Sequence, residues 1–113
     1  MDGSTTPVIF GSAGANAVGT KNFGISTFIN SSSVTTADQN VSVGFNSMGL
    51  SVSTASRNVA VGFETGSSMT IANDCVLVGF DAGKGITDGD ENTIIGSNAG
   101  ETITTGNKNT IIG

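Results

Sequence analysis

The sequence predicts an all-β protein, a repetitive solenoid of the β-helix or β-roll type with coils of about 17 residues. One five-residue block recurs as "NVSVG" at 40–44, "NVAVG" at 58–62, "CVLVG" at 75–79, and "NTIIG" at 92–96 and 109–113. Gly, Ser, Thr and Asn make up about half of the 113 residues, and such a composition disfavours helix. Self-similarity at a fixed period of this length is typical of stacked repeats.

The repeat divides the chain into two parts. Residues 40–113 carry regular repeats, whereas residues 1–39 carry degenerate ones, with a weaker copy at 22–26, "NFGIS", and a further candidate copy at 7–11, "PVIFG". Neither part is long or apolar enough to bury a conventional core, because only 36% of the residues are hydrophobic. Stability is therefore expected from stacking of neighbouring coils.

Each block is expected to form a short strand. Alternate residues of a strand point to the same face, so the second and fourth positions form an apolar stripe. We expect stacking to bury this core stripe, which comprises Val41, Val43, Val59, Val61, Val76, Val78, Ile95 and Ile112, together with Thr93 and Thr110. The intervening position becomes more apolar from Ser42 to Ile111, which predicts that the second face is also buried towards the C-terminus.

A second strand is predicted in each coil from an apolar residue followed by a hydroxyl residue. The pairs are Val52-Ser53, Met69-Thr70, Ile86-Thr87 and Ile103-Thr104.

The first and last positions of the block have backbone roles. The repeat positions are Asn40, Gly44, Asn58, Gly62, Cys75, Gly79, Asn92, Gly96, Asn109 and Gly113. The glycines, with second glycines at Gly49, Gly66, Gly83 and Gly100, predict sharp turns with positive φ. The asparagines tolerate left-handed backbone, and stacked in register they predict a ladder of amide hydrogen bonds.

A coil of this size makes a thin monomer, which favours assembly of identical chains. Three copies about an axis share one interior and cover their lateral edges. We therefore expect a homotrimer.

The net charge of −5, with only four Lys and Arg, disfavours nucleic acid and anionic membranes as partners. No apolar run is long enough for membrane insertion. The N-terminus "MDGSTTPVIF" lacks the pattern of a signal peptide, which predicts that the chain is kept in the cytoplasm until release.

The block "N-[VT]-x-[VI]-G" followed by "x-x-A/T-G" resembles the repeats of trimeric β-helical or β-roll shafts in bacteriophage and other viral tail fibres. It is also similar to the head repeats of trimeric autotransporter adhesins. The resemblance covers residues 40–113 well and 7–39 poorly, and Cys75, Ser26 and Pro7 depart from the pattern.

The resemblance implies a non-enzymatic structural segment of a tail fibre in a virion, which contributes to host attachment and needs no cofactor. It implies as partners further copies of the chain, other fibre or baseplate proteins, and a host surface receptor. The alternative is an adhesin head repeat on a bacterial surface, and a third hypothesis is a polysaccharide-cleaving spike domain.

Other chemistry is less well supported. "GFDAGKG" at 79–85 resembles a phosphate-binding loop, but its glycine spacing is one residue short and sister repeats replace Lys84. Asp74, Asp81, Asp88, Asp90 and Glu91 could bind Ca²⁺ or cleave a glycoside, but the EF-hand and RTX patterns are absent, as are Trp and Tyr to hold a sugar, and we interpret these residues as a solvated acidic rim.

Three further features are interpreted structurally. Cys75 has no histidine to activate it, so we expect it to fill a small buried space. The hydroxyls at 53, 70, 87 and 104 recur once per coil, whereas ice-binding faces have paired threonines. Phe45, Phe63 and Phe80 are expected to cap the core between chains, with receptor binding as the alternative.

Overall fold

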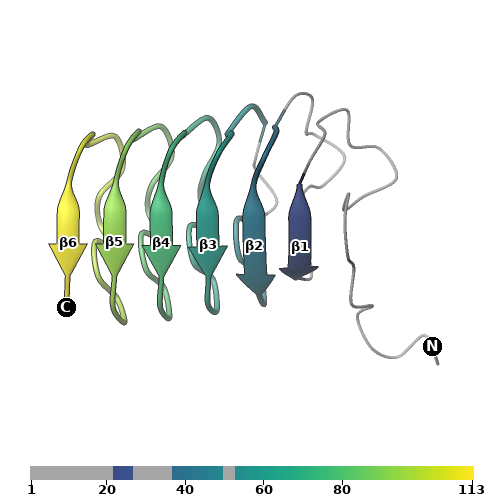
Figure 1. Ribbon diagram of the computed structural model, residues 1–113. Coiled ribbons are helices and arrows are strands. Elements are labelled where there is room, and N and C mark those ends of the chain that lie inside the picture. Colours follow the sequence, from purple (N-terminus) through teal and green to yellow (C-terminus); the bar gives the residue numbers. More distant parts are fainter. Residues whose placement is uncertain (1–21, 27–36, 50–52) are drawn as a thin grey trace.

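The computed structural model describes residues 22–26, 37–49 and 53–113, which form one parallel β-solenoid (Figure 1). Its strands are β1 (Phe23–Ser26), β2 (Val41–Gly44), β3 (Val59–Val61), β4 (Val76–Val78), β5 (Thr93–Ile95) and β6 (Thr110–Ile112). The predicted all-β solenoid with coils of about 17 residues is confirmed, with about four turns. The described part of the chain contains no helix that could cross a membrane.

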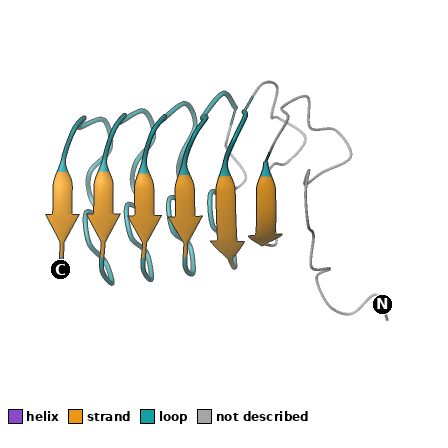
Figure 2. Cartoon of the chain, viewed as in Figure 1, coloured by secondary structure: helices purple, strands orange, loops and turns teal. Residues whose placement is uncertain are grey.

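The strands line up in sequence order in one six-stranded sheet, each parallel to the next. The register aligns equivalent positions of successive blocks, so Val59 pairs with Val76, and Val76 pairs with Thr93. Figure 2 shows strands along one side of each coil and loops along the rest. Side chains at one repeat position therefore form a column that runs along the solenoid.

The predicted second strand is wrong, because each described coil contains a single strand. The apolar–hydroxyl pairs lie in bends that are hydrogen-bonded from coil to coil. The Thr70 N–H donates to the Thr87 carbonyl at 3.0 Å, and the Thr87 N–H donates to the Thr104 carbonyl at 2.9 Å. Too few consecutive residues are extended there to make a strand, and Val52 lies outside the described residues.

The block glycines turn the chain as predicted, with φ of 130° at Gly44, 141° at Gly62 and 136° at Gly79. Glycine is required at Gly79 for a second reason. A Cβ atom there would lie 2.5 Å from the Gly96 carbonyl oxygen of the next coil. Adjacent coils therefore approach too closely at this corner for any side chain.

Two details of the predicted turns are wrong. Met48, with φ of 51°, occupies the left-handed position that Gly66 fills in the next coil, whereas Gly49 lies close to the Ser67 carbonyl. The left-handed residue at the start of each block is also not asparagine. It is the residue before it, namely Gln39, Arg57, Asp74, Glu91 and Lys108.

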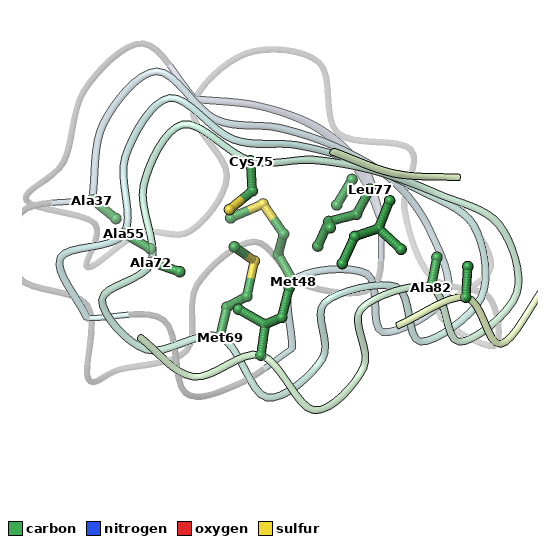
Figure 3. Close-up of a cluster of buried hydrophobic side chains, with 12 residues drawn as sticks. Ala37, Met48, Ala55, Met69, Ala72, Cys75, Leu77 and Ala82 are labelled. Atoms are coloured by element: carbon green, nitrogen blue, oxygen red, sulfur yellow. The ribbon is translucent and has the colours of Figure 1, made fainter. Parts of the chain in front are cut away.

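The interior of the solenoid is narrow and is filled mainly by small side chains (Figure 3). Leu77 and Ile94 occupy the middle of their strands, and Met69 and Ile86 approach from the bends; all four are fully buried. Ala37, Ala55 and Ala72, from successive coils, form a column of buried side chains along one side of the interior. Each coil thus contributes only a few apolar side chains, and the core is continuous only because the coils stack.

The predicted core stripe does not lie in this interior, and the expectation that stacking alone buries it is wrong. The middle residue of each strand points inwards, while the second and fourth block positions point outwards. Val76 is 37% exposed, Ile95 is 38% exposed and Ile112 is 74% exposed. The asparagine that begins the block is buried, so period-2 alternation turns the middle residue inwards and the stripe outwards.

Candidate functional site: the outer face of the sheet

The outer face of the sheet carries three columns of side chains. The first column is Phe23, Val41, Val59, Val76, Thr93 and Thr110, and the second is Ile25, Val43, Val61, Val78, Ile95 and Ile112. The third column follows the block glycine and consists of Phe45, Phe63, Phe80 and Ser97. We call the residues of these three columns the outer face.

The phenylalanines of the third column stack on one another. The ring centroids of Phe45 and Phe63 lie 5.2 Å apart, and those of Phe63 and Phe80 lie 5.4 Å apart, with interplanar angles of 14° and 9°. The rings nevertheless remain 42–56% exposed. The ladder therefore stabilises the stack of coils and at the same time presents a strip of aromatic surface.

The outer face is uncharged over its whole length, although the chain carries a net charge of −5. Large exposed apolar patches on soluble proteins mark interaction sites, whereas isolated surface apolar residues do not. Here three adjacent columns are apolar through β2, β3 and β4. This face is the strongest candidate site in the described part of the chain.

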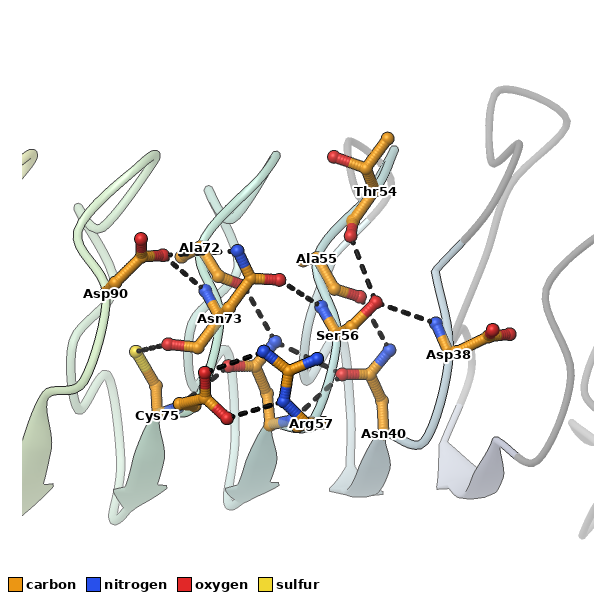
Figure 4. Close-up of polar contacts among 12 residues, drawn as sticks. Asp38, Asn40, Thr54, Ala55, Ser56, Arg57, Ala72, Asn73, Cys75 and Asp90 are labelled. Atoms are coloured by element: carbon orange, nitrogen blue, oxygen red, sulfur yellow. Dashed lines mark hydrogen bonds and ion pairs between the residues drawn. The ribbon is translucent and has the colours of Figure 1, made fainter.

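A ladder of buried amides holds the coils in register on the inner side of the strands (Figure 4). The amide oxygen of Asn40 accepts hydrogen bonds from the backbone N–H and the side-chain amide of Asn58, at 3.0 and 3.1 Å. The amide nitrogen of Asn58 donates to the Ala72 carbonyl at 2.8 Å. Asn22, Asn92 and Asn109 repeat these contacts, which confirms the predicted ladder.

Cys75 interrupts the amide ladder. Its N–H still donates to the Asn58 amide oxygen at 2.9 Å, and its thiol lies 3.2 Å from the Gly89 carbonyl oxygen. Burial raises the pKa of the thiol, against the opposing effect of hydrogen bonding from the Asn92 backbone. Cys75 is fully buried, as expected for a residue that fills a small space.

A second ladder, which the sequence analysis missed, runs two residues before the first. The Asn73 side-chain oxygen accepts from the Ser56 N–H at 2.9 Å, and an Asp90 carboxylate oxygen accepts from the Asn73 N–H at 2.7 Å. The Asn107 oxygen accepts from the Asp90 N–H at 2.7 Å. Recurrence of Ser, Asn and Asp at a 17-residue spacing was the available signal.

The predicted acidic rim is only partly correct. Asp74 is exposed and forms a two-bond ion pair with Arg57 at 2.7 and 2.8 Å, which lowers the pKa of Asp74, mainly through the hydrogen bond. Asp81, however, is 7% exposed. Among the described residues, no group of three or more acidic, cysteine or histidine residues could hold a metal ion.

Asp81 and Glu64 share one cation. The Lys84 ammonium lies 2.6 Å from a Glu64 carboxylate oxygen and 3.2 Å from one of Asp81. The two hydrogen bonds raise the pKa of Lys84. Lys84 thus ties one turn to the turn of the preceding coil, a structural role in place of phosphate binding.

The hydroxyls of the bends also bond from coil to coil. The Ser53 hydroxyl lies 3.1 Å from the Thr70 carbonyl oxygen, and the Thr70 hydroxyl lies 3.1 Å from that of Thr87. Thr87 continues the series to Thr104 at 3.3 Å. These hydroxyls are committed to main-chain carbonyls, unlike those of a free hydroxyl array.

Comparison with known proteins returned no matching family model, no matching curated protein and no matching solved structure.

Proposed function

We propose that this chain is a non-enzymatic structural segment of a bacteriophage or other viral tail fibre, that it works as a homotrimer in the virion, and that it contributes to host attachment. The observation that carries the proposal is a regular solenoid with an uncharged apolar outer face. Stacked coils give a stiff element of defined length, and an apolar face on an acidic chain favours association with identical chains.

The stack itself is suited to a mechanical role. Each described coil is tied to its neighbours by strand pairing, by the amide ladder and by the second ladder of side-chain oxygens. Successive coils repeat the same kinds of hydrogen bonds and pack their buried side chains together, so adding coils lengthens the element without changing its cross-section. Such an element can hold a binding region at a distance from a particle.

Several acidic and basic side chains of types used in catalysis have structural partners. Asp74 is paired with Arg57, Asp90 accepts a backbone hydrogen bond, and Lys84 bridges Glu64 and Asp81. These contacts support the proposed absence of catalysis. In the assembled fibre, the remaining partners would be adjoining fibre or baseplate proteins and a host surface receptor.

The alternative, a head repeat of a trimeric surface adhesin on a bacterial cell, uses the same outer face. The strand "NVAVG" at 58–62 favours it as well. The two differ in the larger protein: an adhesin gene would encode a secretion signal and a membrane anchor, and a fibre gene would lie among those for particle proteins.

Host attachment is tested by binding of fluorescently labelled protein to a panel of bacterial strains. We expect saturable binding to some strains, with no release of sugars from their capsules. The matched control is the Val59→Thr/Phe63→Ser variant, which alters the outer face and leaves the interior intact. Absence of saturable binding across a broad panel would contradict attachment, and sugar release would contradict the absence of catalysis.

A further inference from the structure

The outer face changes its chemistry along the solenoid, and it does so in two columns at once. Between β4 and β5 the first column changes from Val76 to Thr93, and the third changes from Phe80 to Ser97. The second column stays apolar, with Val78 followed by Ile95. Large apolar side chains are thus replaced by hydroxyl residues at the same step in both outer columns.

Contact within one chain does not explain the paired change. Val76 begins β4, whereas Phe80 follows the end of that strand and the turn at Gly79. The second column lies between them. Val76 and Phe80 therefore lie at opposite margins of the outer face.

We propose that the first column of one copy packs against the third column of the next copy at the same level, with the second columns of three copies facing a common axis. This inference rests on the proposed homotrimer and assigns its contacts. In a closed ring every contact is heterologous, so one margin of a face meets the opposite margin of its neighbour. Val76 then meets Phe80 of the next copy, and Thr93 meets Ser97.

The charge distribution supports a second copy as the occupant. The eight acidic and three basic residues in the described part all lie outside the outer face. Identical chains of net charge −5 repel one another, and this face allows close approach without burying an unpaired charge. The asparagines of the amide ladder at positions 22, 40, 58 and 92 are buried inside each chain.

The paired change also sets the direction and level of packing. Parallel copies at one level match apolar with apolar in β2–β4 and hydroxyl with hydroxyl in β5. A shift by one coil would place Phe80 against Thr93, and an antiparallel pair would place β2 against the hydroxyl residues. When the copies are parallel and at the same level, the change from apolar to hydroxyl residues in the first column of one copy lies opposite the same change in the third column of the next.

Disulfide trapping of the full chain tests this arrangement. The double variant Val59→Cys/Phe63→Cys places a cysteine at each margin of one level. A bond within one chain would leave single chains on a non-reducing gel, so only bonds between copies give linked species. We expect a species of three linked chains on non-reducing gels. Cys75 is buried, so the parent chain serves as the blank.

The matched control is Val59→Cys/Phe80→Cys, which uses the same columns one coil out of level. We expect at least tenfold less linked trimer than with the level pair. Linking in this control as efficient as in the level pair would overturn the inference, as would linking by Val59→Cys or Phe63→Cys alone. Circular dichroism like that of the parent shows that each variant is folded.

Light scattering separates the two proposals. If the parent has the mass of three chains but the level pair does not link, the contact assignment is wrong and the trimer stands. If the parent has the mass of one chain, both are wrong. A second variant, Thr93→Val/Ser97→Phe, extends the apolar margins by one coil. We expect it to lower the midpoint concentration of assembly by about tenfold. An unchanged or raised midpoint would contradict the assigned contacts.

Discussion

The coils of β2–β4 and those of β5–β6 differ in the side chains that they place on the outer face and in the interior. In the first group the inner position runs from Ser42 through Ala60 to Leu77, and the outer face is broad and apolar. In the second group the inner positions are Ile94 and Ile111, and Thr93 and Ser97 make the outer margins polar. The inner position becomes larger and more apolar towards the C-terminus, and the outer margins become polar after β4.

The difference indicates which coils depend on contact with another copy of the chain. A coil with Ile94 inside buries its apolar side chains within its own chain. A coil with Ser42 inside and Phe45 outside buries less by itself and exposes more. Assembly should therefore stabilise the coils of β2–β4 more than those of β5–β6.

The largest effect is expected from Gly79→Val. A Cβ atom at Gly79 would meet the Gly96 carbonyl, and its φ of 136° disfavours any β-branched side chain. We expect loss of the folded state, measured by circular dichroism. Gly113→Val is the control for the contact alone, because φ there is also positive, at 117°, but a Cβ meets nothing within 4 Å; a Gly79→Val variant that melts like the parent would refute the close approach.

Truncation of the interior comes next. Leu77 is fully buried, whereas Val76 on the same strand is 37% exposed. We expect Leu77→Ala to cost about 2–5 kcal/mol and Val76→Ala to cost under about 1 kcal/mol in the isolated chain. Denaturant unfolding at low protein concentration checks this. Equal costs for the two variants would contradict the placement of Leu77 in the interior and Val76 on the outer face.

Removal of an amide tests the ladder. Asn58→Ala would leave the Ala72 carbonyl and the Cys75 N–H without their bonds, and the Asn40 amide oxygen would keep only the bond from the backbone N–H of residue 58, at a cost of about 2–4 kcal/mol by the usual penalty for unsatisfied buried groups. Asn109→Ala, at a half-buried position with fewer bonds, should cost less. The melting temperatures of the two variants give the comparison, and a reversed order would contradict it.

Exchange of the outer margins tests the contrast directly. Val59→Thr/Phe63→Ser gives a β3 coil the chemistry of β5. We expect it to weaken assembly by roughly 2–4 kcal/mol per chain, from apolar area left in water, while the fold of the isolated chain is retained. Sedimentation over a range of concentrations measures this, and unchanged assembly would show that the outer face is not the contact.

The smallest effect concerns Cys75. Its folded pKa is raised, so the unfolded chain releases the thiol proton first as pH rises. Its contribution to stability is complete below about pH 8.5, the unfolded value, and declines above it. We expect the parent to lose stability relative to Cys75→Asn as the pH rises above about 8.5, because that variant lacks the thiol and restores the ladder. Parallel curves would refute this.

The sequence was sufficient for the repeat, the single register and the amide ladder, because spacing and strand alternation fix which positions stack. It was misleading about which face lies inside. Val59 and Val61 are more apolar than Ala60, but the interior is too narrow for two large columns, and the buried asparagine fixes the alternation. The hydroxyl bends looked like strands because stacking of coils uses the same residue types as strand pairing.

The outer face could be read from the sequence only as an apolar stripe. Its role as a surface depends on the orientation of the strands, which the structure supplies. The burial of Asp81 was likewise not predictable from the sequence. Glu64 and Asn98 occupy the equivalent position in the turns of the neighbouring coils, but their side chains are more exposed than that of Asp81. The paired change from Val76 and Phe80 to Thr93 and Ser97 gains meaning only once the three columns are known.

The account depends most directly on the mass of the folded protein in solution. Multi-angle light scattering at concentrations from micromolar to several hundred micromolar should give about three times the 11.2 kDa mass of one chain, approached as the concentration rises. A mass of one chain throughout that range would contradict the central claim that the uncharged outer face is covered by identical copies.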